Sequence, residues 1–180
     1  MRFLLLLLLL SACTPRLASL RNVHRYRLPA GSSARELLVI PAYLDNRAAC
    51  VSPERELRIS HFSLGSLSEH VEEPVMSPGG QWLALISVGE GHPVLDVYET
   101  EAVVEAILSG AAELAPAQSL NPYPGLISGL RWLDAHTLRF GSDADFSRLD
   151  PESGGVPYPD LEAEAPVRSW RYDVRSGRAE

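Results

Sequence analysis

The stretch that most constrains the fold is a strand–turn–strand pattern in residues 74–87, which read PVMSPGGQWLALIS. Pro78 presets the backbone for a tight turn, and Gly79 and Gly80 accept positive φ without steric cost. Apolar side chains then occupy successive positions: Trp82, Leu83, Ala84, Leu85 and Ile86. Because neighbouring residues of a strand point to opposite faces, both faces of this strand should be covered. We therefore expect an inner strand within a stack of β-sheets.

Four further segments have the composition or the alternation of β-strands. They span residues 22–28, 36–43, 56–64 and 94–98. The third of them alternates with a period of two, which is typical of a strand. Turn clusters rich in proline and glycine separate the segments, and Pro41 favours a strand end or a sheet edge.

One segment has a helical pattern instead. Between Thr100 and Leu114, apolar residues recur at helical spacing: Val103, Val104, Ile107, Leu108 and Ala111. Thr100 is a suitable N-cap, and Glu101 would interact favourably with the helix dipole in the first turn. The spacing predicts one short helix near residues 100–113.

The strands within residues 56–100 resemble one blade of the TolB-type β-propellers. The matching positions are Ser77, Pro78, Gly80, Leu83, Ala84, Tyr98 and Thr100. Gly79 stands where that family has aspartate, and no glycine follows Thr100. Residues 128–178 resemble a second copy, with the following matches: Trp132, Asp134, Thr137, Leu138, Phe140 and a closing strand and turn over 169–177. The resemblance implies blade-like antiparallel sheets.

The number of copies limits how such blades are arranged. Propellers contain at least about four blades, whereas this chain has two copies and a candidate third in residues 22–64. We predict a mainly β fold of blade-like antiparallel sheets, either partial propeller-like or sandwich. An oligomer that completes a ring is a further alternative. The three tryptophans fall on predicted strands and are expected in the core.

The first thirteen residues have the layout of an export signal. Arg2 is followed by the apolar run Phe3 to Leu10, which at about 1.5 Å per residue is too short to span a membrane. The next residues, Leu10-Ser11-Ala12-Cys13, resemble the lipobox of bacterial lipoproteins. The resemblance implies cleavage before Cys13 and a diacylglycerol on its thiol. An ordinary secretory signal is the alternative.

These features predict the domain organisation and the location. Residues 1–12 would be a signal peptide, residues 13–21 a lipidated cysteine with a short tether, and residues 22–180 a single β-rich domain. The protein would be a membrane-anchored lipoprotein of the cell envelope. Thr14 stands where an aspartate would resemble an inner-membrane retention signal, so an outer membrane is favoured where the organism has one.

Charge excludes one class of partner. The net charge is −7, and all sixteen basic residues are arginine, so nucleic acid is not expected as a partner. The arginines form no dense cluster in the sequence. The first third of the chain, from Arg16 to Arg58, is basic. A weak attraction to an anionic membrane is one interpretation, and a solvated charged face is the favoured one. With Cys13 lipidated, Cys50 lacks a disulfide partner, and its apolar neighbours predict a buried, inert thiol.

The acidic loop of residues 141–166 holds the candidate metal ligands. Asp143, Asp145 and Asp150 are candidate calcium ligands, although Arg148 stands where a calcium loop needs glycine. A solvated acidic loop is the favoured interpretation. No catalytic or nucleotide-binding motif is present, and the only cofactor expected is the covalent lipid.

Together these observations predict a non-catalytic, lipid-anchored β domain that binds or scaffolds another envelope protein. The alternative is an envelope enzyme, or a ligand- or metal-binding protein that uses the acidic loop of residues 141–166.

Overall fold

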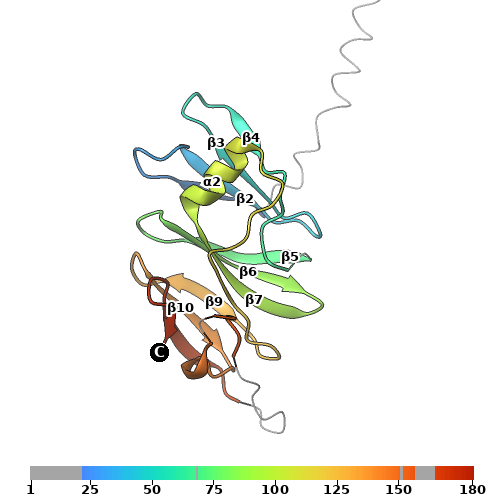
Figure 1. Ribbon diagram of the computed structural model, residues 1–180, viewed down its shortest axis with the longest axis vertical. Coiled ribbons are helices and arrows are strands. Elements are labelled where there is room, and N and C mark those ends of the chain that lie inside the picture. Colours follow the sequence, from blue (N-terminus) through green and yellow to red (C-terminus); the bar gives the residue numbers. More distant parts are fainter. Residues whose placement is uncertain (1–21, 68, 151, 157–164) are drawn as a thin grey trace, which may run out of the picture.

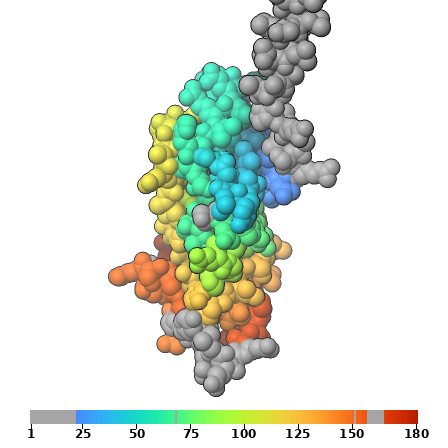
Figure 2. Space-filling model, turned by 90° about the vertical axis from the view of Figure 1, so that its right-hand side faces the viewer, coloured from blue at the N-terminus to red at the C-terminus, as the bar shows by residue number. Residues whose placement is uncertain are grey.

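A computed structural model describes residues 22–67, 69–150, 152–156 and 165–180. Within these residues the chain forms three four-stranded antiparallel sheets and one α-helix. The sheets are stacked along the long axis of the molecule in chain order (Figure 1). Figure 2 shows the same order on the surface, with the first sheet in blue to cyan at one end and the third in orange at the other. The predicted mainly β, blade-like fold is confirmed.

Each sheet is an up-and-down meander of four strands that follow one another in the chain. The first sheet contains β1 (His24–Arg27), β2 (Glu36–Ile40), β3 (Arg47–Val51) and β4 (Leu57–Ile59). The second contains β5 (His70–Met76), β6 (Trp82–Gly89), β7 (His92–Glu99) and β8 (Gln118–Leu120). The third contains β9 (Ser128–Trp132), β10 (Thr137–Ser142), β11 (Arg168–Asp173) and β12 (Arg178–Ala179).

The middle sheet is covered on both faces, as the apolar pattern of β6 predicts. Leu83 and Leu85 belong to a core that the second sheet shares with the first sheet. Ala84 and Ile86 belong to a separate core shared with the third sheet. The second core also holds Trp132, Trp170 and, at its margin, Trp82. The tryptophans are therefore packing residues, as expected.

The β5–β6 hairpin has the expected tight turn, with one correction. Gly80 has φ +69° and its N–H donates to the Ser77 carbonyl at 2.8 Å. Gly79 is not among the residues with positive φ, so only one of the two predicted glycines is required by the turn. A side chain at Gly80 would also meet the Pro29 ring, with Cδ 2.8 Å from an added Cβ.

The predicted helix exists, but both of its ends differ from the prediction. Helix α2 runs Thr100–Ser109, and its N-cap is Glu99, which makes no side-chain capping bond. Gly110 adopts the left-handed conformation and its N–H donates back to Ile107, which ends the helix before residue 113. The helix packs against β3 and β4 through buried residues such as Val103 and Ile107. Among the described residues, no helix combines the length and apolarity needed to cross a membrane.

A buried polar network lies inside the second sheet. The carboxylate of Asp96, on β7, is fully buried. It accepts hydrogen bonds from the Ser66 N–H, the Ser87 hydroxyl and the Ser119 hydroxyl, each at 2.6 Å. These donors come from the segment before β5, from β6 and from β8. One carboxylate therefore joins three parts of the chain that are far apart in sequence.

Candidate functional site

The structure leaves the predicted lipidation site untested. Cys13, the signal peptide and the tether all lie outside the described residues. Lipidation of Cys13 therefore stays a prediction that rests on the lipobox resemblance.

The three aspartates of the acidic loop are described, and each accepts hydrogen bonds from protein groups, two of them within their own turns. Asp143 accepts a hydrogen bond from the Leu126 N–H at 2.6 Å. Asp145 caps the short 3-10 helix Phe146–Arg148, and Asp150 accepts from the Glu152 N–H at 2.9 Å. Hydrogen bonds, first of all from serine hydroxyls, hold the pKa values of Asp145 and Asp150 below their usual range.

The described residues do not join these aspartates into a metal site. In residues 22–67, 69–150, 152–156 and 165–180, no group of three or more His, Cys, Asp or Glu side chains is placed to hold a metal ion. The loop also begins later than predicted, because Gly141 and Ser142 belong to β10. Residues 157–164 of the loop lie outside the described residues.

Cys50 occupies the environment predicted for it. It lies in the centre of β3, is fully buried, and packs in the core between the first two sheets. Burial raises the pKa of its thiol, and Arg58 opposes this only in part. Since the thiolate is the reactive form, Cys50 should be chemically inert in the folded protein.

The strongest candidate for a functional site is the outer face of the third sheet, which we call the arginine face. Arg131, Arg139 and Arg171 lie on three adjacent strands and form one cross-strand row, since Arg139 is opposite both of the others. All three are exposed. Strands are about 4.8 Å apart, so the row extends about 10 Å across the sheet. Residues that are dispersed in the sequence are thus gathered on one surface.

The arginine face contains a shallow hollow of about 360 Å³. Small residues form much of its lining: Ser128, Gly129, Gly141 and Ser169. Arg131, Arg139 and Arg168 also line it, and the Arg139 Nε donates to the Ser169 hydroxyl at 2.8 Å. Small side chains beneath long ones leave the guanidinium groups open to a ligand.

The charge arrangement is unfavourable for the free protein. Like charges placed directly opposite on neighbouring strands destabilise a sheet. Within the part of the chain that the structure describes, the ion pairs involve Arg25, Arg47, Arg58 and His70, and no arginine of the arginine face is in one. The Asp173 carboxylate on the same sheet accepts from the Arg175 and Ser176 N–H groups of its own turn. An external anion would relieve this repulsion.

A sequence signal for the arginine face exists, although the sequence-based predictions do not include this face. In each strand, one arginine stands between two apolar residues: Leu130-Arg131-Trp132, Leu138-Arg139-Phe140 and Trp170-Arg171-Tyr172. The period of a strand then sends the apolar pair into the core and the arginine to solvent. The buried partners confirm this, since they all lie in the second core.

Comparison with known proteins adds no relative to this description. Neither a scan against protein-family models nor a search of curated proteins returned a match.

Proposed function

We propose that the chain is a non-catalytic binding module of a bacterial cell envelope, held at the membrane by a lipid on Cys13. Its arginine face binds an acidic segment of another envelope protein. The observation that carries the binding role is the cross-strand row of Arg131, Arg139 and Arg171. The lipobox residues Leu10-Ser11-Ala12-Cys13 support the anchor.

An acidic protein segment suits this surface for two reasons. Guanidinium groups recognise carboxylates through paired hydrogen bonds in a fixed plane, and an extended acidic chain could place successive carboxylates along the row. The middle of the sequence, residues 59–130, contains no arginine but nine acidic residues. An anionic partner would therefore be repelled from residues 59–130, whereas the row of Arg131, Arg139 and Arg171 would attract it locally.

The binding role is tested by crosslinking in intact cells from a photoreactive residue at position 169, which is exposed on the arginine face. We expect an adduct whose crosslinked peptide, read by mass spectrometry, is rich in Asp and Glu. The double variant Arg131→Thr/Arg139→Thr should reduce the adduct about tenfold or more, because each charge-assisted hydrogen bond contributes roughly 1.5–3 kcal/mol.

A matched control has the same change in charge. Arg148 and Arg175 are exposed in the same half of the chain and do not line the hollow. The double variant Arg148→Thr/Arg175→Thr should leave the adduct unchanged. Equal loss in both double variants, or a crosslinked peptide without acidic residues, would contradict the proposal.

The anchor is tested separately by Cys13→Ala. This change removes the thiol that takes the lipid, and stable anchoring requires two or more acyl chains or an equivalent second signal. We expect the variant to lose metabolic labelling with fatty acid and to leave the detergent-soluble membrane fraction. The anchor is disproved when both the labelling and the fractionation of Cys13→Ala equal those of the unchanged protein.

A further inference from the structure

The outer face of the first sheet differs in chemistry from the arginine face. The register places one set of side chains opposite each other on the side away from the core: Leu38, Ile40, Ala49, Val51, Leu57 and Ile59. We call this set the apolar face. Leu57 and Ile59, on the edge strand β4, are 61% and 53% exposed. The side chains of the other parity, such as Leu37 and Cys50, lie in the core.

The first sheet is thus apolar on both sides, as the middle sheet is. In the middle sheet both sides are covered by neighbouring sheets. In the first sheet the inner side is covered, and on the outer side Leu38 and Ala49 are 8% and 1% exposed, whereas Leu57 and Ile59 on β4 are open to solvent. A strand that is apolar on both faces is typical of a strand covered on both. The open part of the outer side, at β4, therefore suits a partner that accepts exposed leucine and isoleucine.

Arginines lie along one edge of the apolar face. Arg25 is opposite Leu38 and Arg27 is opposite Glu36, so both lie on β1 beside the apolar residues. Both are exposed, and Arg25 is 3.6 Å from the Glu36 carboxylate. Apolar side chains next to arginine are the combination that binds the interface of an anionic membrane, where the side chains enter the acyl boundary and the cations meet headgroups.

We propose that the apolar face of the first sheet lies on the membrane surface. This inference rests on the proposed lipid anchor. Eight residues of chain separate Cys13 from Asn22, so the lipid is within about 30 Å of the described domain. The chain then enters the first sheet directly, since β1 begins at His24. The sheet nearest to the lipid in the sequence is therefore the sheet with the apolar outer face.

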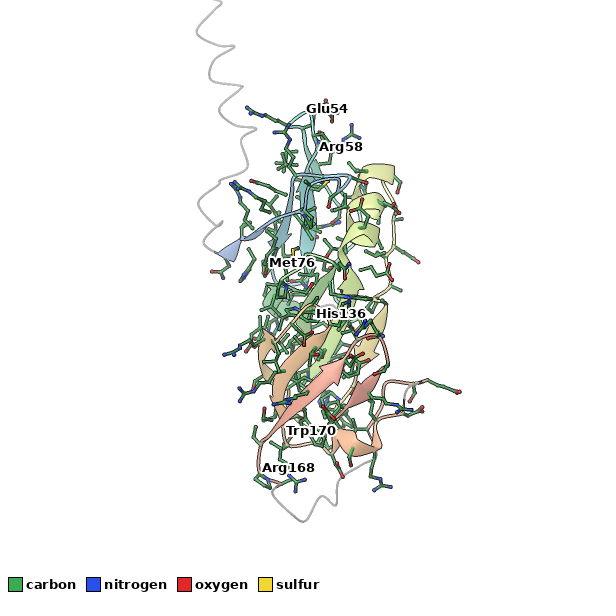
Figure 3. All side chains as sticks on the ribbon, turned by 90° about the vertical axis from the view of Figure 1, so that its left-hand side faces the viewer. Glu54, Arg58, Met76, His136, Arg168 and Trp170 are labelled. Atoms are coloured by element: carbon green, nitrogen blue, oxygen red, sulfur yellow. The ribbon has the colours of Figure 1, made fainter. Side chains whose placement is uncertain are left out.

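This orientation gives the two outer faces different surroundings. Arg58, on β4 of the first sheet, and Arg168, on β11 of the third sheet, lie at opposite ends of the long axis (Figure 3). Stacked sheets are about 10 Å apart, so the arginine face would be held about 20 Å farther from the bilayer than the first sheet. It would then be open to a partner in the space beyond the membrane.

The test uses an environment-sensitive fluorophore on the full lipidated chain in vesicles of phosphatidylcholine and phosphatidylglycerol. The label is attached through Leu57→Cys or, as the control, through Ser169→Cys on the arginine face. Labelling is selective because Cys50 is fully buried and the Cys13 thiol carries the lipid. We expect a lipid-linked quencher to act several-fold more strongly on position 57, and iodide in the water to act more strongly on position 169.

A second pair of variants tests the role of the arginines. Arg25→Thr/Arg27→Thr should reduce lipid quenching at position 57 in vesicles that contain phosphatidylglycerol, whereas Arg131→Thr/Arg139→Thr should not. If positions 57 and 169 are quenched equally in a chain that floats with the vesicles, the proposed contact between the apolar face and the membrane is wrong. The proposed lipid anchor is unaffected by that result. If the chain does not float with the vesicles and Cys13 carries no acyl mass, both proposals are wrong: the lipid anchor and the membrane contact of the apolar face.

Discussion

Asp96→Ala should lower the free energy of unfolding by about 3–5 kcal/mol. The carboxylate is fully buried and accepts three hydrogen bonds of 2.6 Å. Its removal leaves the Ser66 N–H and the Ser87 and Ser119 hydroxyls without this acceptor, and Ser87 is fully buried, so water reaches its hydroxyl poorly. Urea unfolding of the full chain measures the change, and the melting temperature should fall by roughly 10 °C.

Two controls separate burial from hydrogen bonding. Ser119→Ala removes a single donor and should cost about 1 kcal/mol. Asp150→Ala removes an exposed carboxylate that also accepts from the Glu152 N–H and the Ser153 hydroxyl, and should cost less than about 1 kcal/mol. If Asp96→Ala unfolds at the same urea concentration as Asp150→Ala, the buried network does not stabilise the fold as described.

Phe146→Ala should be destabilising to a similar extent, by about 3–5 kcal/mol. The Phe146 ring is 1% exposed, and its centroid lies 5.0 Å from that of Phe140 and 5.7 Å from that of Trp170. Alanine would leave a cavity between two aromatic rings that the sheet holds in place. The same urea titration gives the value.

The conservative variant Phe146→Leu keeps most of the volume and should cost about 1.5 kcal/mol or less. A small effect of Phe146→Ala, equal to that of Phe146→Leu, would mean that the site collapses freely around the missing ring. The expected large effect would show that the segment after β10 is held by its apolar residues, although acidic residues dominate its composition.

The elements predicted from the sequence are those in which one local pattern decides the structure. The run from Trp82 to Ile86 predicts a strand covered on both sides. Its alternate side chains point to opposite faces, and a sheet covered on one face only would leave half of these apolar side chains exposed. The cores on either side of β6 confirm it. The strands around Trp132 and Trp170 were likewise located by their resemblance to blade motifs.

The elements missed are those whose signal depends on distant residues. Strand β3 (Arg47–Val51) contains two alanines, which have weak strand preference, and it is fixed by pairing with β2 and β4. Strand β8 (Gln118–Leu120) is short, polar and held by β7. The arginine face depends on the register that aligns Arg131, Arg139 and Arg171, and no single segment of the sequence encodes that alignment.

The two separate cores on either side of the middle sheet have a mechanical consequence. In stacked architectures each layer is stabilised mainly by its neighbours, so one terminal layer can open while the rest stays folded. Here Leu85 belongs to the core shared with the first sheet, and Ile86 belongs to the core shared with the third sheet. Loss of the third sheet would thus spare the first sheet, and a pulling force applied between the first and third sheets would act on two cores in series.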